Sequence, residues 1–245
     1  MNQKSLILKN VSKTFRISDK KVDTLKGRLF NLFSNENFKE FKAVDNINLE
    51  ITKGENFGII GRNGSGKSTL VKLMSGAFVP DEGGQIIKNG TSMLLNLGVG
   101  MSHELTAREN VYVSGSALGL KIKEIDNIFN EIIAFAELEE FVDSKIKYFS
   151  SGMIQRLSFA IAINAGADIM FLDEVFAVGD AKFKKKAIEV MEKSWIDGRT
   201  IIMVSHSLSN IEQYCKRAIY LKKGKIAFLG DAKEAIKLYK EDNKS

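Results

Sequence analysis

Eight residues in the first third of the chain have the composition and spacing of a phosphate-binding loop. Residues 61–68 read GRNGSGKS, which matches the pattern G-x-x-x-x-G-K-[ST]. Glycines in such a loop let backbone N–H groups point at phosphate oxygens, the lysine reaches the β and γ phosphates, and the last hydroxyl binds Mg²⁺. The sequence therefore predicts that Lys67 contacts the phosphates of ATP and that Ser68 is a ligand of Mg²⁺.

The segments on either side of this loop favour the same chemistry. The apolar run NFGII before it is typical of a buried strand, and a helix is predicted from Lys67 to about Gly76. Such a helix directs the positive end of its dipole at the phosphates, which an ordinary glycine-rich turn, the alternative, would not do. The predicted nucleotide-binding residues of the loop are Gly61, Arg62, Asn63, Gly64, Ser65, Gly66, Lys67, Ser68 and Thr69.

Two adjacent carboxylates form a second candidate site. Residues 168–174 read DIMFLDE, an apolar strand that ends at Asp173 and Glu174. Ligands of doubly wound sheets bind beyond the carboxyl ends of the strands, and adjacent residues of an extended strand face opposite ways. We therefore assign Asp173 to Mg²⁺, through water, and Glu174 to the attacking water as general base. Helix capping is the alternative for such a pair.

The elements that must position these residues alternate between strands and helices. Apolar alternation predicts strands over 6–17 and 46–51, ahead of the loop. Three helices without an intervening strand, over 108–118, 124–138 and 152–164, indicate a helical lobe. The remaining predicted elements are strands over 168–172 and 200–204, helices over 181–195 and 232–240, and a hairpin over 218–228 that turns at Lys223-Gly224.

The expected fold class is therefore α/β. It consists of a P-loop NTPase core with a mostly parallel sheet, an antiparallel β subdomain and a helical subdomain. We expect a single nucleotide-binding domain over 1–245, with the helical lobe at approximately 104–165 and an insertion at approximately 18–42. Within the insertion, Leu25, Leu29, Leu32 and Phe33 recur at helical spacing and predict an amphipathic helix. Its apolar side would pack on the rest of the chain, on a membrane partner or at the lipid headgroup boundary.

Composition excludes several other classes of protein. The 245 residues are 44% hydrophobic and 27% charged, close to the averages of soluble globular proteins, which excludes disordered and collagen-like chains. A lone Cys215 cannot form an internal disulfide, and no run approaches the roughly 18 apolar residues of a membrane span. The net charge of +6 is mild, and the basic run KFKKK at 182–186 is typical of a solvated face, so we expect no nucleic-acid partner.

Residues 149–156 add a motif that resembles a known family. They read FSSGMIQR and precede an alanine-rich helix and then the DIMFLDE strand. This arrangement resembles the ATP-binding cassette (ABC) family, whose signature is usually LSGGQ. The resemblance implies that Ser150 and Gly152 touch the γ phosphate of the nucleotide held by the other subunit. A helix cap is the alternative for this segment. With one loop and one signature per chain, a head-to-tail homodimer is expected.

The resemblance also assigns roles to three isolated residues. Asp180 matches the aspartate of a loop that crosses the dimer interface, and His206 matches the histidine that contacts the γ phosphate, although a surface histidine is the alternative. Phe15 resembles the aromatic residue on which adenine stacks. Strand packing is an alternative for Phe15, and Phe41 is a second candidate for the adenine contact.

One family feature is missing, and its replacement is informative. The family usually has a glutamine ligand of Mg²⁺ ahead of the helical lobe, yet no glutamine occurs over 86–154. Residues 94–110 read LLNLGVGMSHELTAREN instead, which resembles the ATPase subunits of exporters for lipid-linked polysaccharides such as O antigen, capsule and teichoic acid. The resemblance implies an ATPase that is peripheral to the cytoplasmic face of the cell (inner) membrane. It also implies a separate integral-membrane ABC-2-type permease, through which the lipid-linked glycan passes.

Three other functions stay open at this point. An exporter ATPase for drugs or small lipids would share every catalytic residue but would not need the insertion or the glycine-rich segment at 94–110. A soluble regulator or ribosome-associated ATPase usually carries two cassettes in one chain. A scaffold that binds ATP without hydrolysing it would not need Glu174 and His206.

Overall fold

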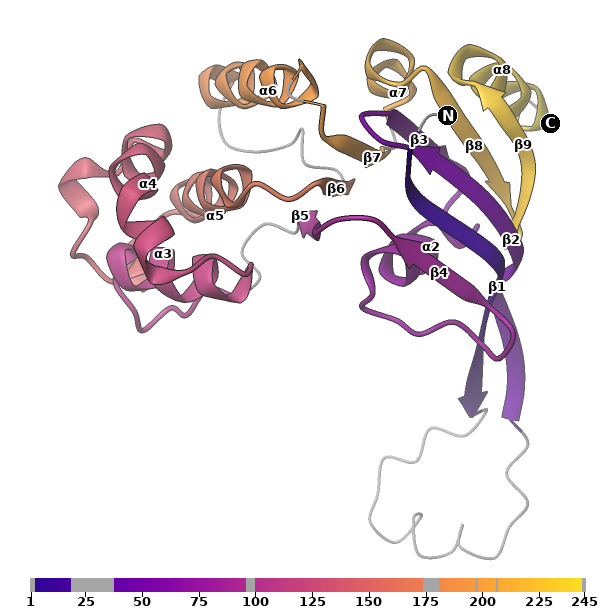
Figure 1. Ribbon diagram of the computed structural model, residues 1–245, viewed down its shortest axis with the longest axis horizontal. Helices are drawn as coiled ribbons and strands as arrows, with labels where there is room; N and C mark the ends of the chain where they lie inside the picture. The colour runs from indigo at the N-terminus through magenta and orange to yellow at the C-terminus, as the bar shows by residue number, and fades with distance from the viewer. Residues whose placement is uncertain are drawn as a thin grey trace, which may run out of the picture.

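The computed structural model describes residues 3–18, 38–95, 100–173, 181–196, 198–205 and 207–243. Three parts are visible in Figure 1: a six-stranded sheet with helices on it, a three-stranded antiparallel sheet, and a lobe of helices to one side. The α/β fold class expected from the sequence is confirmed.

The central sheet has the strand order β5-β6-β7-β3-β8-β9. Its strands are β3 (Asn56–Ile60), β5 (Ser92–Leu95), β6 (Ile169–Asp173), β7 (Thr200–Val204), β8 (Arg217–Lys222) and β9 (Lys225–Asp231). The first five in spatial order are parallel neighbours, and β9 pairs antiparallel with β8 as the predicted hairpin. The sheet is thus mostly parallel, as predicted.

Both faces of the sheet are buried at its central strands β3, β6 and β7, and these strands are mostly apolar. On β6, Ile169 and Phe171 pack with helix α2 (Lys67–Ser75) and the antiparallel sheet. Met170 and Leu172 point to the other face. The helices with buried residues on that face are α5 (Ser151–Ala165), α6 (Ala181–Ile196), α7 (Leu208–Tyr214) and α8 (Ala232–Asp242).

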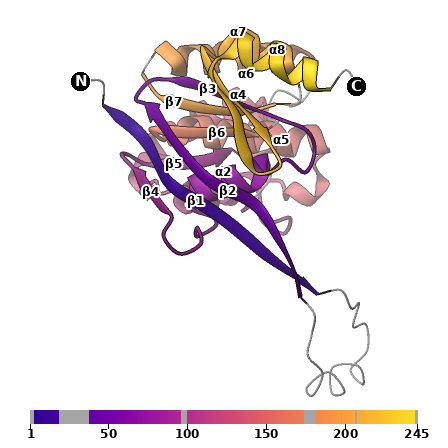
Figure 2. The ribbon, with the colours of Figure 1, turned by 90° about the vertical axis from the view of Figure 1, so that its right-hand side faces the viewer.

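The antiparallel sheet consists of β1 (Lys4–Ser18), β2 (Phe38–Thr52) and β4 (Gln85–Lys88), in the order β2-β1-β4. Figure 2 shows β1 and β2 running on together beyond the body of the molecule. Because β2 begins at Phe38, the last five residues of the expected 18–42 insertion belong to a strand. The helix predicted within the insertion lies outside the described residues.

The helical lobe contains α3 (Ala107–Ala117), α4 (Ile122–Ala136) and the first part of α5. Helix α3 begins with a capping box: the Glu109 amide donates to the Thr106 hydroxyl at 3.2 Å, and the Thr106 amide donates to the Glu109 carboxylate at 2.7 Å. The three helices share a core of their own. All three were predicted from the sequence, each within two residues of its bounds. None of the described helices is long and apolar enough to cross a membrane.

Candidate functional site

The phosphate-binding loop connects β3 to α2, as predicted. Gly66 is the cap residue at the start of α2, with a φ of 105°, and no side chain caps this helix end. The first N–H groups of a helix have no partner within the helix, so the uncapped turn leaves them available to an anion. The local geometry therefore fits a phosphate group.

Neighbouring backbone holds this loop and requires a glycine at position 66. A Cβ at Gly66 would lie 2.2 Å from the carbonyl oxygen of Ala43, on β2. The carbonyl oxygen of Ser65 accepts a hydrogen bond from the amide of Gly224, in the β8–β9 turn, at 2.9 Å. The carbonyl of Gly224 in turn accepts from the amide of Asp45, also at 2.9 Å. The loop is thus supported by two elements far from it in sequence.

Lys67 lies across the loop that contains it. Its side chain is buried, and its ammonium donates to the carbonyl oxygens of Gly61 at 2.7 Å and Arg62 at 3.0 Å. A buried ammonium needs such partners because desolvation is costly. The positive charge is therefore held at the loop, beside the uncapped start of α2.

The sheet brings Asp173 to the same edge as the loop. Val204 of β7 pairs with Asp173 of β6 on one side and with Ile59 of β3 on the other. Since these strands are parallel, their carboxyl ends meet at one edge, where the phosphate-binding loop begins and β6 ends. Asp173 is the last residue of β6.

Three predicted site residues follow β6 or β7 in the sequence, and all three lie outside the described residues. Glu174 follows Asp173, and Asp180 precedes α6. His206 follows Ser205, just past the end of β7. Their roles stay predictions.

The residues at this edge of the sheet are of the types that bind Mg²⁺ and a nucleoside triphosphate. Ser68 is exposed in the first turn of α2, and Asp173 ends a strand two positions away in the sheet from the strand that leads into the loop. A hydroxyl and a carboxylate are hard oxygen ligands of the kind that Mg²⁺ takes, together with phosphate oxygens. The uncapped helix end and Lys67 suit the negative charge of the triphosphate.

The two candidates for the adenine contact face each other. Phe15 of β1 and Phe41 of β2 are paired directly across the antiparallel ladder. The Phe15 ring is half-buried and lies edge-on to Phe78 with centroids 5.8 Å apart, whereas Phe41 is 48% exposed. Phe15 therefore does pack within the chain, and its place as the adenine contact stays a prediction, with Phe41 as the alternative.

The signature residues lie at the start of α5. Ser150 is the cap residue of this helix, and its hydroxyl accepts from the amide of Met153 at 3.2 Å. Gly152 is in the first turn. Because α5 runs from the helical lobe toward β6, its N-terminal end is the end within the lobe, away from α2 (Figure 1). Within one chain, the structure does not bring Ser150 and the phosphate-binding loop together.

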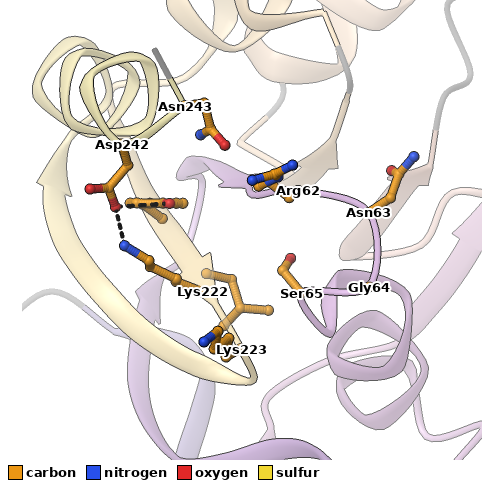
Figure 3. Close-up of a pocket in the computed structure, with 10 residues that line it drawn as sticks. Arg62, Asn63, Gly64, Ser65, Lys222, Lys223, Asp242 and Asn243 are labelled. Carbon is orange, nitrogen blue, oxygen red and sulfur yellow. Dashed lines mark hydrogen bonds and ion pairs between the residues drawn. The ribbon is translucent and has the colours of Figure 1, made fainter. Parts of the chain in front are cut away.

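A pocket of about 330 Å³ lies on the β8 side of the loop. Figure 3 shows the residues of the loop facing the end of α8 across it. The Asp242 carboxylate accepts from Lys222 at 2.6 Å and from the Tyr220 hydroxyl at 3.1 Å, and the Lys222 hydrogen bond lowers the pKa of Asp242. The lining residues are Arg62, Asn63, Gly64, Ser65, Tyr220, Leu221, Lys222, Lys223, Asp242 and Asn243.

Sequence reasoning missed the residues that support the loop from outside. Ala43 contributes only a carbonyl oxygen, so no side-chain pattern could have identified it. Gly224 had a signal, because it was predicted to be the hairpin turn. What the turn contacts was not predicted.

A family described as "ABC transporter" matches residues 44–177. Three curated relatives are similar over most of this chain. One is the "O-antigen export system ATP-binding protein RfbB" of Myxococcus xanthus, 39% identical over 97% of this chain and 56% of its own length. A Klebsiella pneumoniae protein of the same name is 38% identical over 83% of this chain and 82% of its own length. The "Teichoic acids export ATP-binding protein TagH" of Enterococcus faecalis is 38% identical over 95% and 51%.

The chain thus spans about half the length of the Myxococcus and Enterococcus relatives. Among solved structures, the dimeric ATP-binding cassette MJ0796, in a post-hydrolysis state bound to ADP and Pi, has a TM-score of 0.72. It is 26% identical, and the match covers 93% of this chain and 98% of that one. An "ATP binding subunit of ABC transporter" at 21% identity and a TM-score of 0.74 shares the fold.

Proposed function

The chain belongs to the ABC transporter family, and from this membership we propose that it is the ATP-hydrolysing subunit of an exporter for a lipid-linked polysaccharide. One observation carries the catalytic part. Parallel β6, β7 and β3 are neighbours, so the phosphate-binding loop and Asp173 share one edge of the sheet. The cargo rests on the relatives named for export of O antigen and of teichoic acids.

We assign the binding of the triphosphate to the loop and α2. The uncapped N–H groups after Gly66 donate to phosphate oxygens, and the Lys67 ammonium exchanges its carbonyl partners, Gly61 and Arg62, for the β and γ phosphates. Ser68 would hold Mg²⁺ directly, and Asp173 would hold it through water. The metal, when bound, neutralises the charge that develops on the phosphates during transfer.

We assign hydrolysis to residues that follow β6 and β7. Glu174 orients the attacking water and accepts its proton, and His206 donates to the γ phosphate. Both roles come from the motif positions of these residues.

The proposed assembly is a head-to-tail homodimer with two nucleotides between the subunits. Ser150 lies on the helical lobe, away from the loop of its own chain, so it is free to act on a nucleotide held by a second copy. Gly152 and Asp180 act at the same interface. The solved structure of the cassette MJ0796 is dimeric, which supports assembly as a dimer.

The proposed location is the cytoplasmic face of the cell membrane, where the dimer drives a separate integral-membrane permease of the ABC-2 type. The proposed domain organisation is a single nucleotide-binding domain whose helical lobe, at approximately 104–165, lies next to the permease. Movement of the helical lobe on ATP binding and hydrolysis would then be transmitted to the permease.

Two measurements test this function. Purified chain should release phosphate from ATP in the presence of Mg²⁺, and Lys67→Ala should abolish the release. In cells whose surface polysaccharide disappears when this gene is deleted, the parental gene should restore it and the Lys67→Ala gene should not. Restored polysaccharide with the Lys67→Ala gene would refute the export role, and phosphate release by that variant would refute the assigned site.

A further inference from the structure

Glu137 ends α4 in a backbone conformation that disfavours it. It is the cap residue after Ala136 and has a φ of 57°, in the left-handed region. Glycine or asparagine is usual at such a position, because a Cβ is strained there. A glutamate at this place points to a role for its side chain.

The Glu137 carboxylate contacts three cations from two other helices. Arg156 of α5 lies at 3.0 Å, and Lys182 and Lys186 of α6 lie at 3.6 and 3.8 Å. Lys182 and Lys186 are one helical turn apart and therefore share a face of α6. The basic run at 182–186 thus contributes two of its lysines to a specific cluster.

The end of α4 adds further negative charge to this cluster. The last carbonyls of a helix lack partners within it and form the negative end of its dipole. Lys186 donates to one of them, the carbonyl oxygen of Phe135, at 2.9 Å. Its ammonium also lies 4.6 Å from the centre of the Phe135 ring. Lys186 therefore contacts both the Glu137 carboxylate and the C-terminal end of α4.

Three aromatic rings join the same helices underneath the charges. Phe135 of α4, Phe159 of α5 and Phe183 of α6 have centroids between 5.4 and 6.0 Å apart. Phe159 and Phe183 are fully buried. The polar cluster and the aromatic cluster thus connect the same three helices.

Two of these helices begin at segments that the proposed dimer uses. Helix α5 is capped by Ser150, and α6 starts at Ala181, directly after Asp180. Helix α4 belongs to the lobe, whereas α6 packs on the central sheet. A contact that holds all three helices therefore sets how the signature and the start of α6 are placed relative to each other.

We propose that Glu137 is a positioning residue. Its carboxylate holds α5 and α6 at the end of α4, so that the signature at the start of α5 and the start of α6 can contact the partner subunit at the same time. This inference rests on the proposed function, because it requires the nucleotide-bound dimer. Glu137 touches no nucleotide in this scheme. Its loss should weaken assembly of the dimer and leave nucleotide binding by a single chain intact.

The experiment uses the Glu174→Gln chain, in which an ATP-bound dimer should persist. The dimer dissociation constant is measured by sedimentation with ATP and Mg²⁺, and binding to a single chain is measured at low protein concentration with a fluorescent ATP analogue. Adding Glu137→Gln should raise the dimer dissociation constant about tenfold, which corresponds to one lost charge-assisted contact. Nucleotide binding should stay within about twofold. Lys184→Ala, an exposed member of the same basic run, should change neither value.

Two more variants separate positioning from folding. Glu137→Asn suits the left-handed cap and lacks the charge, so it should reproduce the dimer defect even if Glu137→Gln lowers the melting temperature. Arg156→Gln, which removes the cation of the shortest ion pair, should cause part of the same defect.

Each outcome has a separate meaning. If the Glu174→Gln chain itself forms no ATP-dependent dimer, the proposed function fails. If that chain dimerises and Glu137→Gln or Glu137→Asn dimerises as well as it does, the inference is wrong. Equal losses of dimer affinity and single-chain nucleotide binding would also overturn it, since they would show a general structural role.

Discussion

The backbone amide of Gly224 donates a hydrogen bond to the carbonyl oxygen of Ser65 at 2.9 Å. This contact joins the β8–β9 turn to the middle of the phosphate-binding loop. Gly224 has a φ of 78°, and a Cβ there would lie 2.9 Å from the carbonyl oxygen of Ala43. The turn, the loop and β2 are therefore packed backbone to backbone.

Gly224→Ala should weaken nucleotide binding because the turn must move to relieve this contact, and the loop would lose its support. We expect the dissociation constant for an ATP analogue to rise about tenfold, measured by fluorescence titration. Gly83→Ala is the matched control, since Gly83 has a φ of 85° and open space around its missing Cβ. Both variants should lose about 1 kcal/mol of unfolding free energy to backbone strain. Equal nucleotide affinity in the two variants would contradict the supporting role of the turn.

Glu174→Gln tests the general base. Glutamine keeps the shape and hydrogen bonding of the side chain but cannot accept the proton of the attacking water. Phosphate release should fall by roughly 10²–10⁴-fold while ATP still binds. Glu189→Gln, a similar change on α6 away from the site, is the control. Hydrolysis at the parental rate would remove Glu174 from its assigned role.

Asn63→Cys combined with Ser150→Cys tests the head-to-tail dimer. Both residues are exposed, and the proposed dimer places Ser150 of one chain at the loop of the other. A disulfide should form between chains, only with ATP present, and appear as a dimer on non-reducing gels. The native cysteine need not be replaced, because burial raises the pKa of Cys215 to about 12 and keeps its thiol unreactive. A link within one chain would rule out this arrangement.

Much of this architecture could be predicted because its signals are local. The α4 helix has buried apolar residues at helical spacing, from Ile125 to Ala136, and the loop has a motif whose strand and helix are adjacent in sequence. Strands β4 and β5 were not predicted, because segments of four residues such as QIIK and SMLL are too short to show a hydrophobic period. The start of β2 was missed because FKEFK alternates poorly, and its pairing with β1 across the 18–42 insertion decides its structure.

Part of the candidate site, and the Glu137 cluster outside it, could not be predicted for a different reason. The support of the loop by Gly224 and the cations around Glu137 depend on contacts between distant helices and strands. Basic residues in a run such as 182–186 are usually solvated, and only the packing of α6 against α4 selects Lys182 and Lys186 from it.

Asp168 should contribute stability that disappears at low pH. Its carboxylate accepts from the amide and the hydroxyl of Thr91, each at 2.8 Å, and the backbone hydrogen bond is the main cause of its lowered pKa. A carboxyl whose pKa is lower in the folded state stabilises the fold above its unfolded pKa of about 3.9, and this contribution is lost as the pH falls through the folded pKa. The free energy of unfolding of Asp168→Asn should therefore fall below that of the parent at pH 6, and the difference should shrink toward pH 3. A difference that is constant over this range would exclude the linkage.

The insertion is the segment whose role in export can be separated from ATP hydrolysis. Because β1 ends at Ser18 and β2 begins at Phe38, a deletion of residues 20–36 with a short Gly-Ser replacement leaves the paired strands and the adenine candidates Phe15 and Phe41 in place. If the predicted amphipathic helix helps a lipid-linked glycan to enter the permease, phosphate release should stay within about twofold while surface glycan is lost. Glu82→Ser, at the exposed part of the turn before β4, controls for surface disruption. Loss of folding after the deletion would show that the helix packs on its own chain, and unchanged surface glycan would contradict a role in export.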